Sequence, residues 1–391
     1  MKFGIFYHLQ VPKPWTDKSE STVIHQALDQ ISLADRLGYD CAWSGEHHFT
    51  SEYSHISAPE AFLGAASQRT EKIRLGAGIF HLTTQHPLRV AERVGFVDVL
   101  SKGRLEFGMG EGSGDRELAP FGVNPENKTQ MFEEAVQAIM PTFAGGMTEH
   151  RGKYWSWPAR EVVPKPVQKP HPPLWMACSR RESIVRAGAY GLGVLGFQFV
   201  SSQSAHAWVH AYYNEFVKRR RPLTQYKPNP NMAFISFFMC AKTDEEARIR
   251  ADGATFFQFC VLQRWEPSMG TSDMWQSYEL WKRENPEIHA NAIRGGLIGS
   301  PDTIRKKLRK FEQSGIDQVI LLCQSGKNRH EHIMESLELF AKDVMPEFHG
   351  NIPRHEEWKA GVLAGDIQLD EIDVGQYTEK YSTRWGELKT A

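Results

Sequence analysis

The chain has 391 residues, of which 41% are hydrophobic, and its 46 Lys and Arg against 47 Asp and Glu give a formal net charge of −1. This length fits one α/β barrel with insertions, or two ordinary domains. The balanced charge argues against a nucleic-acid binder and an anionic-membrane binder, which usually carry a basic surplus or a polybasic run. The only tight basic run, residues 218–221, is typical of a solvated helix end. No stretch approaches the roughly twenty apolar residues of a membrane span. We therefore expect neither nucleic acid nor membrane as a partner.

The cysteines and the N-terminus point to the cytoplasm. The five cysteines are odd in number and scattered, and no CxxC pair occurs, which argues against a zinc ribbon or a disulfide framework. The apolar run in residues 1–7 is too short for a signal peptide and is more typical of a first strand. We expect a reduced, cytoplasmic protein.

In chain order, strand-like runs alternate with helix-like runs. The predicted strands are 3–9, 40–44, 73–80, 104–109, 174–178, 193–199, 232–240 and 318–323. The predicted helices are 21–37, 58–68, 87–100, 127–143, 180–190, 204–221, one that opens at 243, 301–314 and 330–344. Eight strand-helix units with parallel connections predict a closed (β/α)₈ TIM barrel. The alternative, an open doubly wound sheet, would normally show a nucleotide fingerprint near the N-terminus, and none is found there.

Three segments fall outside this alternation. Residues 145–173 are rich in Pro, Lys and Trp and are predicted to form a long excursion. Residues 263–296 are an aromatic-rich insertion before the last barrel unit. We therefore divide the chain into a barrel domain, 1–346, and an acidic C-terminal extension, 347–391, that wraps the barrel or contacts a second subunit.

Barrel enzymes place their chemistry at the C-terminal ends of the strands. Four unusual segments occupy such positions and should face one cavity. They are 46–49 after the second strand, 76–78 in the third, 108–112 after the fourth and 179–183 after the fifth.

Glu46, His47 and His48 offer three kinds of chemistry. A carboxylate and two imidazoles can ligate zinc, and a histidine can act as acid or base near neutral pH. Neighbouring residues of an extended segment point in opposite directions, so one histidine should face the cavity and the other should pack beneath it. We favour an acid-base histidine, with structural histidines and a metal site as the alternatives.

The glycines of 108–112 only weakly match a dinucleotide-binding loop. Ser113-Gly114-Asp115 follows, and no clean helix opens until about Asn127, so a Rossmann loop is rejected. Glycine lets a backbone approach a flat ligand closely because it has no Cβ. A tight turn is the alternative.

Residues 179–183 open a helix directly after a buried strand. Backbone N–H groups, hydroxyls and nearby arginines at such a position suit a phosphate monoester. A capping box between Ser179 and Glu182 is the other interpretation, and both can hold together.

Taken together, these segments resemble the bacterial luciferase family, the luciferase-like flavin monooxygenases, over nearly the whole chain to about Pro346. The most specific match is the run Trp43-Ser44-Gly45-Glu46-His47-His48-Phe49-Thr50. Further matches are residues 1–4, 86–89, 101–108, 299–301 and 344–346.

The resemblance implies a TIM barrel that binds reduced FMN at the strand C-termini. In the family, O₂ adds to flavin C4a, and the resulting peroxyflavin attacks a carbonyl or oxidises a soft atom. The family's active-site histidine falls on His47, and we expect Glu46 to act with it. The non-proline cis peptide under the flavin ring falls on Gly78-Ile79. The phosphate loop falls on 179–183, and the mobile lid on 263–296.

Two positions depart from the family pattern. A cysteine near flavin C4a is replaced by Gly110, which puts light emission in doubt and leaves room for a larger substrate. An arginine near the phosphate is replaced by Glu111, whose carboxylate would repel that group. We therefore expect Arg180 or Arg181 to supply the positive charge, with a solvated or salt-bridged loop residue as the alternative role for Glu111.

The sequence thus predicts a two-component FMN monooxygenase acting on a small, largely apolar substrate with O₂. A separate NAD(P)H:flavin reductase would supply reduced FMN, since no nicotinamide motif is present, and the family implies a homodimer. No metal is expected. The predicted cofactor-binding residues are Gly78, Ile79, Gly110, Glu111, Cys178, Ser179, Arg180, Arg181 and Ser183.

Three other functions stay open. The first is an F420-dependent oxidoreductase on the same barrel, which transfers hydride without O₂. The second is a flavin-binding protein without catalysis. The third is a metal-dependent hydrolase that uses Glu46, His47 and His48.

Overall fold

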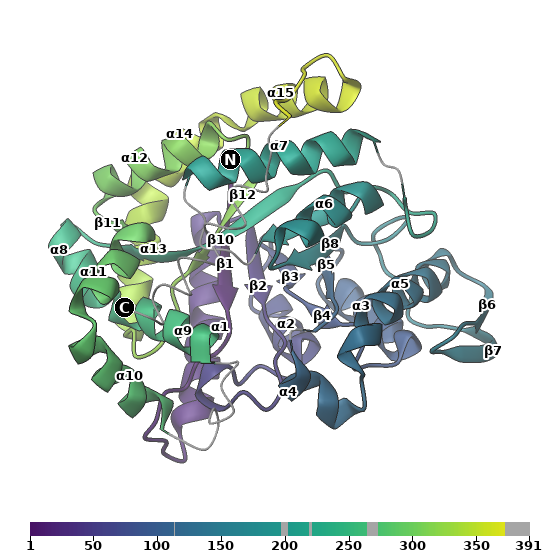
Figure 1. The fold of residues 1–391 in the computed structure, drawn as a ribbon, viewed down its shortest axis with the longest axis horizontal. Coiled ribbons are helices and arrows are strands. Elements are labelled where there is room, and N and C mark those ends of the chain that lie inside the picture. The colour runs from purple at the N-terminus through teal and green to yellow at the C-terminus, as the bar shows by residue number, and fades with distance from the viewer. Residues whose placement is uncertain (113, 197–201, 219–220, 264–272, 372–391) are drawn as a thin grey trace.

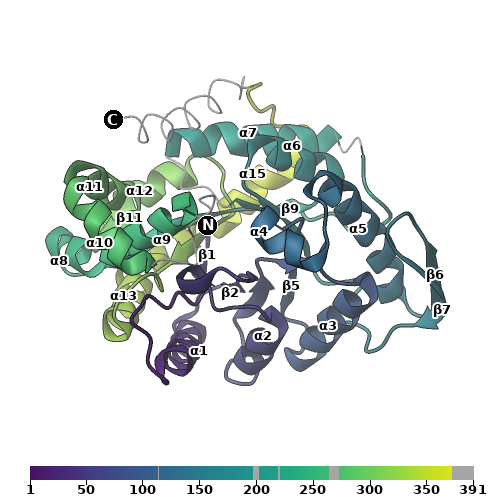
Figure 2. The same ribbon diagram turned by 60° about the horizontal axis from the view of Figure 1, so that its bottom comes forward.

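The structure is a computed structural model that describes residues 1–112, 114–196, 202–218, 221–263 and 273–371. Eight parallel strands form a closed barrel in the order β10-β12-β1-β2-β3-β5-β8-β9, because β9 at one end of this order pairs with β10 at the other (Figures 1 and 2). The strands are β1 (Lys2–Tyr7), β2 (Cys41–Ser44), β3 (Arg74–Ala77), β5 (Leu105–Gly110), β8 (Leu174–Cys178), β9 (Gly193–Gly196), β10 (Met232–Cys240) and β12 (Gln318–Leu322). The predicted TIM barrel is confirmed. Residues 197–199 of the sixth predicted strand lie outside the described residues.

One predicted strand is divided in two. The segment 73–80 forms β3 and, after Gly78 and Ile79, the short β4 (Phe80–His81), which pairs with the end of β5. A further short strand, β11 (Leu297–Gly299), extends the sheet beside the end of β10.

Helices surround the barrel on its outside (Figure 2). They are α1 (Ser19–Leu37), α2 (Pro59–Ser67), α3 (Pro87–Leu100), α5 (Lys128–Ala144), α6 (Arg181–Tyr190), α7 (Ser202–Lys218), α8 (Asp244–Arg250), α12 (Pro301–Glu312) and α13 (His330–Asp343). Their ends follow local chemistry. Gly38 ends α1 in the left-handed conformation, and the Ser300 hydroxyl caps α12 by accepting from the Thr303 N–H at 3.4 Å. Residues 219 and 220 of the predicted helix 204–221 lie outside the described residues.

Two of the three segments outside the strand-helix alternation contain regular secondary structure that was not predicted from the sequence. Segment 145–173 holds an antiparallel hairpin of β6 (Met147–Arg151) and β7 (Ser156–Glu161), which projects from one side of the barrel (Figure 1). The insertion contains α10 (Met274–Glu284) and α11 (Pro286–Gly295), which pack on α9 (Asp252–Gln263). Residues 264–272, with Trp265, lie outside the described residues.

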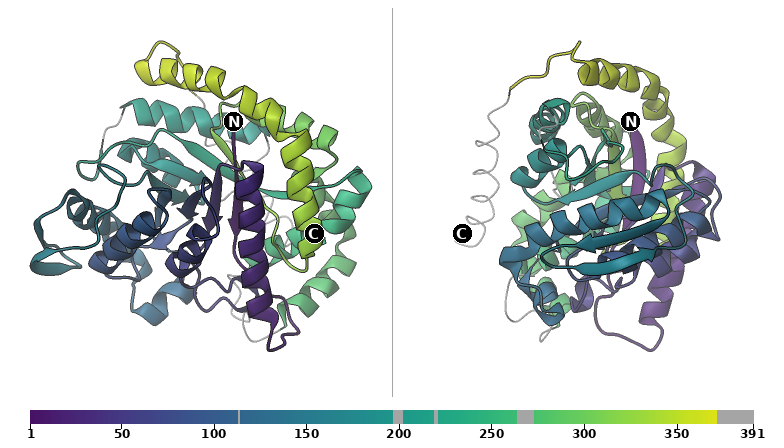
Figure 3. Two further views of the ribbon diagram at one scale, coloured as in Figure 1. Left: turned by 180° about the vertical axis from the view of Figure 1, so that it is seen from behind. Right: turned by 90° about the vertical axis from the view of Figure 1, so that its right-hand side faces the viewer.

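The described part of the C-terminal extension packs on the barrel. It comprises α14 (Met345–Gly350) and α15 (Ile352–Ala364), and α15 runs beside α7 (Figure 3). Asp317, just before β12, joins this helix to the barrel, because its Oδ1 lies 2.8 Å from His355 Nε2 and 3.1 Å from Lys359 Nζ. No helix among the described residues is both long and apolar enough to span a membrane.

Candidate active site

The segments that follow the parallel strands meet at one face of the barrel, as the positional argument predicted. His47 follows β2, and its Nδ1 lies 2.8 Å from Oε1 of Glu117, a residue of the short helix α4 (Asp115–Leu118) after β5. The Glu117 side chain is 2% exposed and that of His47 is 12% exposed. A buried carboxylate that accepts from Nδ1–H fixes the ring orientation and leaves Nε2 as the nitrogen that can exchange a proton.

Aromatic rings hold His47 from two sides. The imidazole of His8, directly after β1, stacks on it with 4.7 Å between ring centroids, and Tyr53 meets it edge-on at 5.1 Å. Both neighbours are buried. His47 therefore has one defined position at the barrel mouth.

Glu46 is a buried anchor. It is 1% exposed, and its Oε1 accepts hydrogen bonds from His48 Nε2 at 3.0 Å and from Gln85 Nε2 at 2.6 Å. Its Oε2 accepts from the backbone N–H of His81 at 3.1 Å. These bonds tie the segment after β2 to the segment around β4, and the expectation that Glu46 acts with His47 stays a prediction.

The two histidines of the motif take different partners, but the expected contrast between one that faces the cavity and one that packs beneath it is absent, since their side chains are 12% and 15% exposed. His47 turns to Glu117, and His48 turns to Glu46. Glu46, His48 and His81 have candidate metal-ligand atoms within 4.8 Å of one another. The trio considered from the sequence is therefore divided, since His47 is not part of that group.

The glycines in the second half of β5 are required by contacts between protein atoms. A Cβ at Gly108 would overlap the carbonyl oxygen of Ala77, and a Cβ at Gly110 would overlap Cδ1 of Ile79. The Gly78–Ile79 peptide bond is cis, at the position that the resemblance implied. The sequence suggested a flat ligand or a turn for these glycines, whereas the structure gives them a packing reason.

The start of α6 holds the predicted phosphate loop. Ser179 and Arg180 are exposed, and Cys178 beneath them is fully buried, which raises the pKa of its thiol to about 12. Ser183 Oγ accepts from the Arg180 N–H at 3.2 Å and donates to the Arg180 carbonyl at 2.5 Å. The expected box between Ser179 and Glu182 is thus wrong by one residue, because the helix begins at Arg181 with Arg180 as its cap.

Glu111 is salt-bridged, the alternative that the sequence left open. Arg186 of α6 pairs with its Oε1, and Thr129 Oγ1 donates to its Oε2 at 3.2 Å. Arg186 is therefore the arginine that pairs with Glu111, and the expectation that Arg180 or Arg181 supplies the positive charge at the phosphate stays a prediction. Arg186 lies one helical turn beyond Ser183, and this spacing places the two residues on one face of α6. The same spacing could have identified Arg186 as a site residue from the sequence.

Sequence reasoning missed other residues of this site as well. His8 directly follows β1, so the rule about strand ends could have found it. Glu117 lies in a four-residue helix within a segment taken as irregular, and no pattern marked it.

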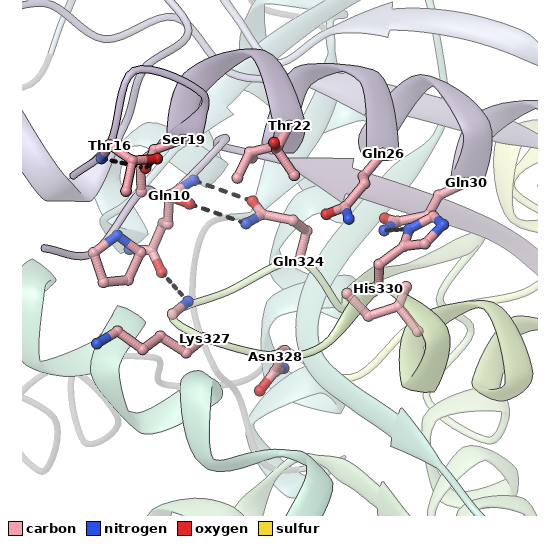
Figure 4. A pocket seen from close by; sticks show the side chains of 15 residues that line it. Gln10, Thr16, Ser19, Thr22, Gln26, Gln30, Gln324, Lys327, Asn328 and His330 are labelled. Atoms are coloured by element: carbon pink, nitrogen blue, oxygen red, sulfur yellow. Dashed lines mark hydrogen bonds between the residues drawn. The ribbon is translucent and has the colours of Figure 1, made fainter. Parts of the chain in front are cut away.

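A polar groove of about 310 Å³ lies between α1, the loop after β1, the loop after β12 and the start of α13 (Figure 4). The Gln324 side chain makes two hydrogen bonds of 3.1 Å to the Gln10 backbone, because its Oε1 accepts from the N–H and its Nε2 donates to the carbonyl. The groove is lined by residues other than the predicted cofactor ligands.

Comparison with known proteins fits this arrangement. The family described as "Luciferase-like monooxygenase" matches residues 1–318. The chain belongs to the luciferase-like monooxygenases. One relative is the uncharacterised protein y4vJ of Sinorhizobium fredii, 32% identical, with 87% of this chain and 95% of that protein aligned. Another is the oxygenase component of a flavin-dependent trigonelline monooxygenase of Acinetobacter baylyi, 25% identical, with 89% and 96% aligned.

Solved structures share the fold of this luciferase-like protein. Monooxygenase RslO1 of Streptomyces bottropensis matches with a TM-score of 0.74 at 24% identity, over 89% of this chain and all of that one. The oxygenating constituent of 3,6-diketocamphane monooxygenase of Pseudomonas putida, solved with FMN, gives 0.68 at 19% identity, over 88% and 98%. An F420-dependent tetrahydromethanopterin reductase of Methanopyrus kandleri gives 0.64 at 20% identity, over 89% and 99%.

Proposed function

We propose that this protein is the oxygenase of a two-component system that uses reduced FMN and O₂ to oxygenate a small, largely apolar organic substrate. The observation that carries the proposal is the His47–Glu117 pair at the barrel mouth, with the ring of His81 at 6.3 Å from that of His47. A histidine held by a buried carboxylate suits proton transfer at a reacting oxygen atom.

The residues present fit both the phosphate end and the ring end of FMN. The start of α6 offers backbone N–H groups with the exposed Ser179 and Arg180, a donor set that suits a phosphate. Arg186 lies on the same helix, α6, and pairs with Glu111 after β5. It is a second cation for the phosphate end. Ile79 and Gly110, in contact at the barrel mouth, would lie against the flat ring. Bound reduced FMN would supply the electrons that activate O₂.

The protein's own residues would then orient the reactants and move one proton. His47 Nε2 would give or take the proton, while Glu117 holds Nδ1–H. Trp275 and Trp281, which pack on Phe256 and Phe259 of α9, are part of the proposed lid that would exclude water. A separate NAD(P)H:flavin reductase would deliver reduced FMN, and we propose a homodimer in the cytoplasm.

The main alternative, an F420-dependent oxidoreductase, is supported by the likeness to the F420-dependent reductase. The two functions differ in their need for O₂ and in their cofactor. A phosphate-capturing helix start and an acid-base histidine are compatible with either, but the likeness to the flavin-dependent trigonelline monooxygenase component over 89% of this chain favours oxygen chemistry.

The deciding experiment is anaerobic titration with photoreduced FMN, followed by rapid mixing with O₂ under absorbance detection. Micromolar FMN binding and a transient spectrum distinct from reduced and oxidised flavin would support the proposal. Binding of F420 in place of FMN would overturn it.

A His47→Ala variant tests the role of the imidazole. It should bind reduced FMN within about threefold of the parent and lose about 10²–10⁴-fold in the rate of the oxygen-dependent step. His25→Ala, at an exposed position on α1, is the matched control and should behave as the parent. An unchanged rate in His47→Ala would contradict the assigned role.

A further inference from the structure

A second group of candidate metal ligands lies on the outside of the barrel, where the C-terminal segment meets α7. His206 and His210 stand one helical turn apart on that helix, with their ring centroids 3.9 Å from each other. Asp370 lies beyond the end of α15, and its Oδ2 is 3.5 Å from His206 Nε2 and 3.8 Å from His210 Nδ1. The ligand atoms of all three residues lie within 4.8 Å of one another.

Asp370 is held in this place by its backbone. Its N–H donates to His210 Nδ1 at 3.1 Å, and its carbonyl accepts from Asn214 Nδ2 at 3.1 Å. Residues 206, 210 and 214 are spaced by four, so they form one ridge along α7. The ridge fixes the carboxylate next to both imidazoles, which preorganises the three ligands.

The distances fit a shared metal ion better than hydrogen bonds. Separations of 3.5 and 3.8 Å exceed the range of about 2.7–3.2 Å that hydrogen bonds prefer. A tetrahedral Zn²⁺ with bonds of about 2.0–2.1 Å separates its ligand atoms by about 3.4 Å. Small side-chain rotations would therefore bring all three atoms to one ion.

The exposure of the ligands is also suitable. The side chains of His206 and Asp370 are 43% and 74% exposed, so an ion can enter from solvent and keep a water ligand. Coordination through His210 Nδ1 replaces its bond from the Asp370 N–H, which water can then satisfy at this exposed residue.

We propose that His206, His210 and Asp370 form a surface site for a divalent transition metal ion that fastens the C-terminal segment to α7. Two imidazoles and one carboxylate match Zn²⁺, whereas Mg²⁺ and Ca²⁺ prefer oxygen ligands alone. The site is separate from the residues proposed for flavin chemistry, so it is independent of the proposed function.

The test is Co²⁺ titration of the metal-free full-length protein, with Zn²⁺ displacement. About one equivalent of Co²⁺ should give the visible absorption of a tetrahedral site, and Zn²⁺ should abolish it. His206→Ala and Asp370→Asn should each weaken binding by at least about 100-fold, because each removes one of three ligands. Both positions are exposed, so both variants should fold. Zn²⁺ should raise the thermal midpoint of the parent but not of Asp370→Asn.

Matched controls keep the result specific. His25→Ala removes another exposed histidine, and Asp366→Asn removes an exposed carboxylate from the same C-terminal segment, and both should bind Co²⁺ like the parent. The proposal is overturned by absent Co²⁺ absorption, or by binding that survives His206→Ala and Asp370→Asn. Loss of binding in His81→Asn alone would place the ion at the barrel mouth and would also overturn it.

Discussion

The side chain of Ile79 occupies the space that a Cβ at Gly110 would need. Gly110 stands where the luciferase-family pattern has a cysteine. We expect Gly110→Cys to lower the free energy of unfolding by about 1–3 kcal/mol, because the added atoms overpack a filled contact. The second substitution in Gly110→Cys/Ile79→Ala shortens the Ile79 side chain. Gly110→Cys should therefore lower the free energy of unfolding less in the Ile79→Ala background than in the parent. Urea denaturation of the two single variants and the double variant measures the coupling.

Gly64→Ala is the matched control for this cycle. Its Cβ would lie 3.6 Å from Leu100, an ordinary contact, and Gly64 lies inside α2. This variant should be as stable as the parent or slightly more so, because alanine favours a helix. Strictly additive effects of the Gly110 and Ile79 changes would show that the two residues do not share the space as the structure indicates.

The sequence predicted the barrel well because each strand-helix unit is a local pattern. Periodicity, Gly38 after α1 and the cap at Ser300 are all visible within a few residues. The site was predicted only where it follows strand ends. The partner of His47 could not be predicted, because Glu117 lies 70 residues away and the contact depends on how the loop after β5 folds over the barrel.

Glu117→Gln should slow the oxygen-dependent step without removing the histidine. The amide can still accept from His47 Nδ1–H, but it no longer offers a negative charge to the ring when the ring carries a proton. We expect a loss of about tenfold or more in that step and FMN binding within about threefold of the parent. Stopped-flow absorbance measures the rate, and a flavin titration measures the affinity.

A second substitution separates charge from shape. Glu117→Ala removes the acceptor altogether and should slow the step further than Glu117→Gln. Equal rates in the parent and both variants would show that Glu117 only packs beside His47 and does not assist it.

The pairing of Arg186 with Glu111 makes a prediction about the phosphate end of FMN. Arg186→Ala should weaken FMN binding by about 10- to 150-fold, since one charge-assisted hydrogen bond contributes about 1.5–3 kcal/mol. Glu111→Gln should tighten it, because it releases the guanidinium and removes a nearby negative charge. Riboflavin, which has no phosphate, serves as the control ligand and should respond little to either change. Equal responses for FMN and riboflavin would place the phosphate elsewhere.

Asp317 connects the C-terminal extension to the barrel and gives the protein an acid-sensitive contact. Burial raises the pKa of its carboxyl, but the hydrogen bond from His355 and the charge of Lys359 outweigh burial, so the pKa lies below its usual value. The Asp317 carboxylate therefore stabilises the folded state fully above the unfolded-state pKa of about 3.9. This stabilisation is lost as pH falls through the lower folded-state pKa.

Asp317→Asn should lower the free energy of unfolding by about 3–5 kcal/mol at neutral pH, because it leaves the buried Lys359 without its main partner. The difference in the free energy of unfolding between the parent and Asp317→Asn should stay constant from about pH 7 to pH 5. It should narrow below about pH 4, where the stabilisation by the Asp317 carboxylate of the parent is lost. Urea denaturation across this range measures both. Asp302→Asn, which removes an exposed partner of Arg305, should cost less than about 1 kcal/mol at every pH. A difference between variant and parent that does not narrow below about pH 4 would show that Asp317 is not the titrating group.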